Sequence, residues 1–312
     1  MASRSIIGAA ERTALEAACG EHVTFDAPLA EHTWYRVGGP ADALVGAGST
    51  AVLAEVLRIC ARVDMPWFAL GSGTNLLVGD GGMRGVVFHL RGEYGAVHWS
   101  DEPGEPFVRA EAGASASLPA FCGQAARLGC MGIASLAGIP GSVGGTLRMN
   151  GGTDREFGEF VEEVLVQTPQ HPEPHAVSVQ YFYRHTNLAR DAVVAKVRLR
   201  FERGDPQAVR GELKARLQRR NATQPIRYPS AGSVFRNPQG DKAGRLIEAA
   251  GCKGWRCGGA EVSALHANFI VNAGDAKAAD IATLMARVRR RVHERFGVDL
   301  VLEQHLVGVF DE

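Results

Sequence analysis

Apolar residues recur at helical spacing in three stretches of the chain, and we predict an amphipathic helix for each. The first is capped by Ser49 or Thr50, and its apolar positions are Val52, Leu53, Val56, Leu57 and Cys60. The second covers Leu118–Leu128, with Ser117 as its N-cap and a glycine after its end. The third lies nearer the C-terminus, with apolar positions at Ile281, Leu284, Met285, Val288, Val292 and Phe296.

Short apolar runs predict strands, and their character changes along the chain. Ala43–Val45 and Trp67–Leu70 flank the first helix and form a βαβ unit with it. Beyond residue 84 the strands are short and β-rich: Gly85–Leu90, Pro106–Ala112 and Val193–Leu199. A further buried strand is predicted over Val298–Leu302. Together the helices and strands predict an α+β fold.

The stretch Leu136–Gly152 is dense in glycine, with apolar residues rather than linker residues between the glycines. Glycine removes the Cβ atom where backbone passes close to another group, so a row of N–H groups can face phosphates or the oxygens of a flat ring. The stretch matches neither a Walker loop nor the Rossmann fingerprint. Taken alone, it could equally be a tight, buried corner of a sheet.

A second glycine turn, Gly71–Asn75, follows the strand at Trp67–Leu70. The carboxyl end of such a strand is where ligands collect in α/β sheets, and consecutive N–H donors there suit a pyrophosphate. Leu76 stands where a Rossmann turn needs its third glycine, so a classical NAD fold is not expected. Two separate glycine turns suggest one extended ligand held at two points.

Composition sets limits on partners and location. The chain has 312 residues, with 34 Lys and Arg against 34 Asp and Glu, so its charge favours neither nucleic acid nor an anionic membrane. Its six cysteines have no zinc-like spacing, so we expect no metal site and buried thiols in a reducing compartment. The N-terminal apolar run is too short for a signal peptide, and no stretch approaches the length of a membrane helix. We therefore expect a soluble, cytoplasmic protein.

Several motifs follow one another in an order that is more specific than any one of them. They are TWYRVGGPAD at 33–42, GSGTNLLV at 71–78, AGIPGSVGGTLRMN at 137–150, YRHT at 183–186, YPSAGSVFRNP at 228–238, HANFIVN at 266–272 and Glu303. This set, which covers roughly residues 20–310, resembles the UDP-N-acetylenolpyruvoylglucosamine reductase family. Because Leu199 leads almost directly to Asp205, the insertion that forms a lid in one branch is absent, and the chain resembles the shorter, lidless type II branch.

The resemblance implies a two-lobe FAD-binding domain, of the PCMH/vanillyl-alcohol-oxidase-like type, followed by a C-terminal α+β substrate-binding domain. We expect an N-terminal arm or helix at 1–20, FAD-binding lobes at 21–83 and 84–203, a substrate-binding domain at 204–300, and a C-terminal segment with the catalytic glutamate at 301–312. The Arg-Gly-Asp-Pro sequence at 203–206 supplies the boundary before the third part, and a basic helix is predicted over 207–220.

The activity that the resemblance implies is NADPH-dependent reduction of UDP-N-acetylglucosamine enolpyruvate to UDP-N-acetylmuramate through non-covalent FAD, in peptidoglycan precursor synthesis. Flavin N5 would deliver a hydride to the enolpyruvyl group, and the protein is expected to act as a monomer. The residues matched to cofactor binding lie in the two glycine turns: Gly71, Ser72, Gly73, Thr74, Asn75, Leu76, Gly138, Ile139, Pro140, Gly141, Ser142, Gly144, Gly145, Asn150 and Gly151.

Three residues match the family's catalytic positions. Arg184 would hold the substrate carboxylate bidentately and stabilise the enediolate, since the aromatic run before it is expected to exclude water. Ser233 would protonate the substrate carbon, because a developing carbanion is basic enough for a weak acid. Glu303 would lie beside the same carbon. Tyr183 and Asn237 match substrate-binding positions, Asn237 on the diphosphate.

Departures from the family pattern leave parts of this hypothesis open. The sequence 152–157 replaces a usual Tyr-Gly turn, so flavin contacts beyond Gly151 are not assigned, and Gln304-His305 stands where Pro-Glu is frequent. One alternative is an FAD-dependent oxidase of the same superfamily, although Gly71–Asn75 lacks the histidine to which many such oxidases attach flavin. Another is a non-catalytic nucleotide-sugar-binding module, which would not need Arg184, Ser233 and Glu303 intact.

Overall fold

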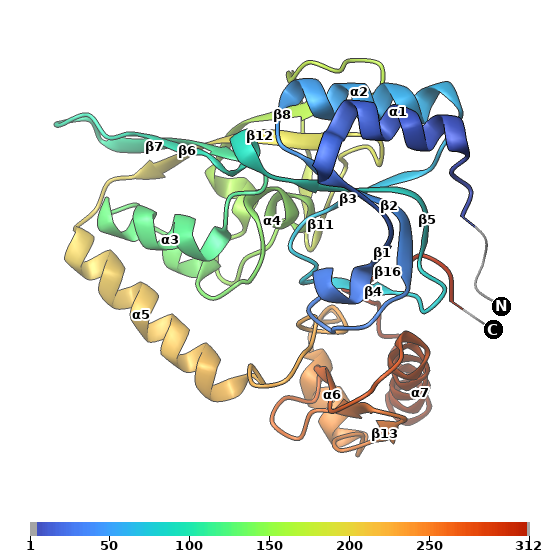
Figure 1. Cartoon of the computed structure of the whole chain (residues 1–312). Helices are drawn as coiled ribbons and strands as arrows, with labels where there is room; N and C mark the ends of the chain where they lie inside the picture. Colours follow the sequence, from blue (N-terminus) through green and yellow to red (C-terminus); the bar gives the residue numbers. More distant parts are fainter. Residues whose placement is uncertain (1–4, 311–312) are drawn as a thin grey trace.

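A mixed sheet with two helices packed on it forms the first part of the chain in the computed structural model, which describes residues 5–310 (Figure 1). Its strand order is β1-β2-β5-β3, with β1 antiparallel to β2 and with β2 and β3 parallel to β5. The elements are α1 (Ala9–Cys19), β1 (Val23–Pro28), β2 (Pro40–Ala47), α2 (Thr50–Arg62), β3 (Trp67–Leu70), β4 (Leu76–Val78) and β5 (Met83–Leu90).

The first helices follow the predicted pattern. Ser49 Oγ accepts a hydrogen bond from Val52 N at 3.4 Å and so caps α2, whose apolar face is buried on the sheet. The N-terminal segment, predicted to be an arm or a helix, forms the helix α1 in its described part. Leu15 of this helix is buried in the same core, which holds the helix against the sheet.

An antiparallel sheet of five strands, in the order β6-β7-β12-β8-β9, forms the second part. Its elements are β6 (Val97–Ser100), β7 (Phe107–Gly113), α3 (Leu118–Arg127), α4 (Val143–Met149), β8 (Val161–Gln167), β9 (His175–Val177), the hairpin β10 (Tyr181–Phe182) and β11 (His185–Thr186), and β12 (Val193–Glu202). Phe121, Phe160 and Phe201 pack together in its core. One predicted boundary is wrong: strand β5, placed in the second lobe, lies between β2 and β3 of the first sheet.

A second predicted boundary, at residue 204, is also wrong. Helix α5 (Pro206–Thr223) falls in the predicted substrate-binding domain but packs on the second part of the fold. Its residue Val209 is buried in the core of the second part, and Leu213 packs against that core beside α3. The Asp205-Pro206 pair is a helix start, because the Asp205 carboxylate accepts hydrogen bonds from Gln207 N and Ala208 N. A separate unit therefore begins only after α5.

The third part packs a three-stranded sheet against two helices, and its elements are α6 (Ala243–Ala249), β13 (Arg256–Cys257), β14 (Ala260–Val262), β15 (Ile270–Asn272), α7 (Ala278–Phe296) and β16 (His305–Val307). Short 3-10 helices lie at Gly20–His22, Leu29–His32, Gly92–Gly95, Ile133–Leu136 and Phe157–Phe160. All predicted apolar positions of α7 are buried except Phe296, which is 37% exposed in the last turn.

The first and third parts share contacts and a core. Tyr35, Val37 and Leu77 of the first part are buried among residues of the third. The Asp80 carboxylate accepts hydrogen bonds from Ala278 N and Ala279 N, both at 2.9 Å, and so caps α7 from the other part.

The strand predicted over Val298–Leu302 is wrong. Only Leu302 forms a bridge, to Phe235, and the strand proper is β16, which pairs in parallel with β4 of the first part. Val301 is 59% exposed, so the apolar run is not buried on all sides. The chain thus returns to the first part at its end.

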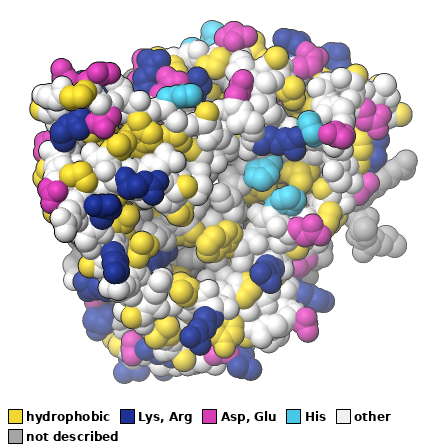
Figure 2. Space-filling model, turned by 60° about the vertical axis from the view of Figure 1, so that its left-hand side comes forward, with side chains coloured by type: hydrophobic (Ala, Val, Ile, Leu, Met, Phe, Trp, Pro, Cys, Tyr) yellow, Lys and Arg dark blue, Asp and Glu magenta, His cyan; other side chains and the backbone are white. Residues whose placement is uncertain are grey.

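Acidic and basic side chains are interspersed over the face shown in Figure 2, as the equal numbers of the two charges suggest. Among residues 5–310, no helix has the length and apolar character that crossing a membrane requires. All six cysteines are free thiols, and five of them are buried.

Candidate active site

The two glycine turns lie against each other. Thr74 Oγ1 donates a hydrogen bond to Pro140 O at 3.3 Å, and a Cβ atom on Gly141 would lie 3.2 Å from the same Thr74 oxygen. A Cβ on Gly73 would lie 2.0 Å from His32 O, so only glycine fits there. The two glycine turns, which are far apart in the sequence, suggest one ligand held at two points, and the fold brings the two turns into contact.

Backbone donors at these turns lack partners within the protein. The N–H groups of Ser72, Gly73, Thr74 and Gly141 donate to no acceptor among residues 5–310. Grouped unpaired N–H donors suit the phosphates of a dinucleotide, so the residues present fit FAD. The second turn is less extended than predicted, because Ser142 Oγ accepts from Gly145 N and starts the short helix α4, which ends at Asn150 (φ 44°).

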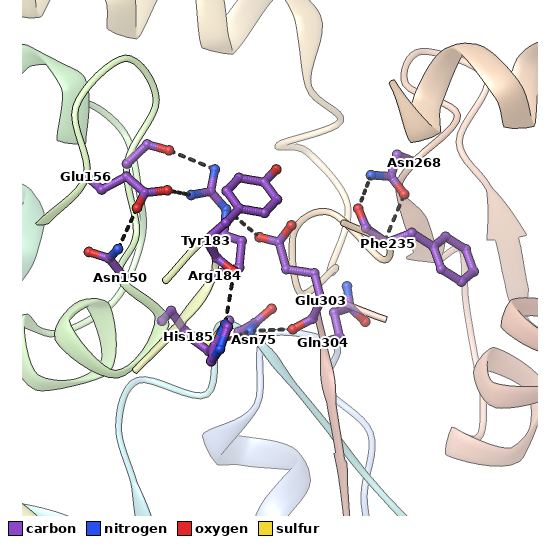
Figure 3. Close-up of polar contacts among 12 residues, drawn as sticks. Asn75, Asn150, Glu156, Tyr183, Arg184, His185, Phe235, Asn268, Glu303 and Gln304 are labelled. Carbon is purple, nitrogen blue, oxygen red and sulfur yellow. Dashed lines mark hydrogen bonds and ion pairs between the residues drawn. The ribbon is translucent and has the colours of Figure 1, made fainter. Parts of the chain in front are cut away.

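Arg184 lies in the tight turn of the β10–β11 hairpin, with a φ of 60° that few non-glycine residues adopt. Each nitrogen of its guanidinium has a partner (Figure 3): Nη2 donates to Gly152 O at 2.8 Å, Nη1 is 3.5 Å from a Glu156 oxygen, and Nε is 3.4 Å from a Glu303 oxygen. Its carbon Cζ lies 4.7 Å from the centre of the Tyr183 ring. The guanidinium is therefore fixed in plane and direction.

Glu303 comes to Arg184 from the C-terminal segment. Its N–H donates to Val234 O at 2.8 Å, and its carbonyl accepts from Asn75 Nδ2 of the first glycine turn at 3.0 Å. Burial raises the pKa of the Glu303 carboxyl, and the positive charges of Arg184 and Arg236 oppose that rise. The carboxyl group thus takes up a proton more readily than a surface glutamate.

Ser233 lies in the turn that Glu303 touches. The backbone on either side of it is held, since Val234 O accepts from Glu303 N and Gly232 O accepts from Gln304 Nε2 at 3.1 Å. The Ser233 hydroxyl has no hydrogen-bond partner among the described residues, so it is available to a ligand. The three predicted catalytic residues therefore come together through direct contact between Arg184 and Glu303 and through the backbone for Ser233.

Comparisons with known proteins identify the family. Residues 224–307 match the profile described as UDP-N-acetylenolpyruvoylglucosamine reductase, C-terminal domain, and residues 41–170 match an FAD binding domain. UDP-N-acetylenolpyruvoylglucosamine reductase 2 of Symbiobacterium thermophilum is 43% identical over 285 residues, which cover 90% of this chain and 91% of that protein. The reductase of Moorella thermoacetica is 42% identical over 286 residues, covering 90% and 92%.

The chain belongs to the UDP-N-acetylenolpyruvoylglucosamine reductase family. The solved structure of such a reductase from Thermus caldophilus is 34% identical in sequence, with a TM-score of 0.76. The match covers 91% of this chain and 97% of the Thermus caldophilus chain. The predicted family and fold class, an FAD-binding domain followed by the family's C-terminal domain, are thereby confirmed.

One predicted feature of the reductase site differs in the structure. The aromatic run before Arg184 does not enclose it, since Phe182 and Tyr183 are each 44% exposed. Of this run, the ring face of Tyr183 packs on the guanidinium, and the Arg184 side chain is 18% exposed. The Asn237 side chain is exposed, and its Oδ1 accepts from Ala243 N at 3.1 Å at the start of α6. That contact leaves its amide nitrogen for a ligand.

Sequence reasoning missed residues that hold the reductase site together. Glu156 lies in the segment for which no role was assigned, and Gln304 was noted only as a departure from the family pattern. Gln304 is 3% exposed: its Oε1 accepts from Tyr35 Oη, and its Nε2 donates to Ala231 O and Gly232 O, all within 3.1 Å. It therefore ties the turn of Ser233 to the segment of Glu303. The departure from Pro-Glu to Gln304-His305 was the one feature of the sequence that could have indicated this role.

Replacing Gln304 with alanine should destabilise the protein. The change removes three buried hydrogen bonds, one to the Tyr35 hydroxyl and two to carbonyl groups, so we expect the free energy of unfolding to fall by about 2–3 kcal/mol. Denaturant unfolding followed by circular dichroism measures it, with the exposed Gln239→Ala as control. Equal stabilities for the two variants would contradict the structural role of Gln304.

Proposed function

We propose that the protein reduces UDP-N-acetylglucosamine enolpyruvate to UDP-N-acetylmuramate with NADPH, for peptidoglycan precursor synthesis. The observation that carries the proposal is the contact of Arg184 with Glu303, beside the turn of Ser233 and next to the glycine turn through Asn75. The names of the relatives agree with it. The two glycine turns would hold FAD, which would supply the hydride transfer between NADPH and the enolpyruvyl carbon.

Residues of this chain stabilise the negative charge that develops on the substrate and donate the proton that the substrate carbon takes up. Reduction of the enolpyruvyl group places negative charge on the carbon next to the carboxylate, and a fixed guanidinium stabilises such charge without reorganising. Arg184 has this character because its three nitrogens are held. Ser233 supplies the proton to the carbon. Glu303, whose carboxyl pKa is raised by burial, donates its N–H to the carbonyl of the neighbouring Val234.

Location and assembly are part of the same proposal. Six free cysteines are usual for a reducing compartment, and we place the reaction in the cytoplasm. We propose that the protein acts as a monomer, in which Arg184, Glu303 and the Ser233 turn of one chain meet.

The test is a coupled measurement on the purified protein. NADPH oxidation, followed by its absorbance, should require the enolpyruvyl nucleotide, and the product should carry two more hydrogen atoms by mass spectrometry. Oxygen consumption at the same rate without the nucleotide would favour the FAD-dependent oxidase. Binding of the nucleotide without any turnover would favour the non-catalytic module.

We expect the flavin to be bound without a covalent link. Gly71–Asn75 contains no histidine, and the unpaired N–H groups there offer hydrogen bonds only. Acid or heat denaturation should therefore release the yellow chromophore into the supernatant. Flavin that remains with the precipitated protein would contradict this.

A further inference from the structure

The segment from Gly152 to Phe157, which the family resemblance left without a role, folds back on itself beside Arg184. Gly152 and Glu156 form an antiparallel bridge, and Phe157 N donates to Gly151 O at 2.9 Å. A Cβ on Gly152 would lie 2.1 Å from Arg155 O, so the closure depends on glycine. The closed loop presents both the Gly152 carbonyl and the Glu156 carboxylate to the guanidinium.

Asn150 links this loop to the hairpin that carries Arg184. It is 1% exposed; its Nδ2 donates to the second Glu156 oxygen and, at 3.1 Å, to Phe182 O, while its Oδ1 accepts from Gly158 N at 2.9 Å. One Glu156 oxygen therefore faces Arg184 and the other is fixed by a buried amide (Figure 3). The carboxylate cannot turn without breaking this network.

The guanidinium of Arg184 has a carboxylate on each of two sides. Glu303 faces Nε, and Glu156 faces Nη1. Glu303 belongs to the C-terminal segment near Ser233, whereas Glu156 and Asn150 belong to the FAD-binding part and are held there by their own loop. Glu156 thus ties Arg184 through Asn150 to the second glycine turn, whereas Glu303 ties it through Asn75 to the first.

We propose that Glu156 is a positioning residue, which holds the Arg184 guanidinium in the orientation that receives the enolpyruvyl carboxylate. The inference rests on the proposed function. Since small misplacements of a binding group slow reactions strongly, Glu156→Ala should slow reoxidation of the flavin by the enolpyruvyl nucleotide by about 10- to 100-fold. Reduction of the flavin by NADPH should stay within about threefold. Glu156 makes no contact with residues 71–75, and Asn150, through which it reaches the second glycine turn, keeps its bonds to Phe182 O and Gly158 N in the variant.

Two comparisons separate positioning from a merely structural effect. Glu156→Gln keeps one acceptor oxygen and should give a rate between those of the wild type and Glu156→Ala, and kcat should fall more than KM rises. In the Arg184→Lys background, Glu156→Ala should add little, because its partner is already gone. Asp154→Ala is the matched control: this carboxylate of the same loop pairs with Arg216, is 70% exposed, and should leave both half-reactions unchanged.

The experiment is stopped-flow absorbance of the flavin in the holoenzyme, with the melting temperature recorded for each variant. Full multiplication of the two effects in the double variant, or a lower KM with unchanged kcat in Glu156→Ala, would overturn the positioning role; the second result would make Glu156 a competitor of the substrate carboxylate. Wild-type protein that NADPH reduces but the nucleotide does not reoxidise would overturn the proposed function, and the inference with it.

Discussion

Ser233→Ala should separate the two halves of the reaction. The variant is expected to bind FAD and to be reduced by NADPH as the wild type is, whereas reoxidation by the enolpyruvyl nucleotide should slow by about 10²–10⁴-fold, as when a general acid is lost. The reason is that the Ser233 hydroxyl has no partner among the described residues, so its removal breaks no contact within the protein. Stopped-flow absorbance at the flavin band measures each half-reaction separately.

A folding defect is a poor explanation for such a result, and it can be checked. The Ser233 turn is held by Gln304 and by the backbone of Glu303, and both contacts persist in the alanine variant. Its melting temperature should match that of Ser230→Ala, a control three residues away. Normal reoxidation in Ser233→Ala would refute its assignment as the proton donor, whatever the steady-state rate.

Arg184→Lys should damage the same half-reaction, by about 10²–10³-fold. A lysine places one compact charge where Arg184 makes three separate contacts, with Gly152, Glu156 and Glu303. The two carboxylates then lose a common partner, and the substrate carboxylate loses a flat group with a fixed direction. The reductive half-reaction should change little.

Arg155→Lys is the control for the arginine itself. Like Arg184, Arg155 lies over an aromatic ring, that of Phe160 at 4.5 Å, and pairs with a glutamate, Glu159 at 3.0 Å. It differs by making no contact with Glu303 or the Ser233 turn. Equal losses of reoxidation rate in the two lysine variants would show that the effect of Arg184→Lys is not specific to the site.

Local sequence signals predicted the elements well where one face of an element meets one core. The helices α2 and α3 lie where apolar spacing and capping residues place them, and α7 lies where apolar spacing alone places it. The predicted catalytic positions came from the motif resemblance, and the structure brings two of them, Arg184 and Glu303, into contact. Periodicity alone would not have paired residues so distant in the chain.

The failures concern which surface an element meets, which periodicity does not encode. Strand β5 reads as a β-rich strand wherever it pairs, and only the fold inserts it between β2 and β3. Helix α5 has few apolar residues, so its contact through Val209 gave little signal. Glu156 reaches Arg184 only because Gly152 lets the loop close. The sequence does not indicate which residue a charged side chain in a loop will contact.

The C-terminal segment returns to the first part of the fold, where β16 pairs with β4. This return affects the order in which the protein folds and becomes active. Hydrogen bonds of the site join residues 228 positions apart, Asn75 and Glu303, and 269 positions apart, Tyr35 and Gln304. A nascent chain synthesised only as far as Leu300 contains every strand of both large sheets, yet it has neither the glutamate nor strand β16. Activity is therefore the last property that the emerging protein acquires. For the same reason, a mature molecule in which β16 separates from β4 would lose the reaction while keeping most of its core.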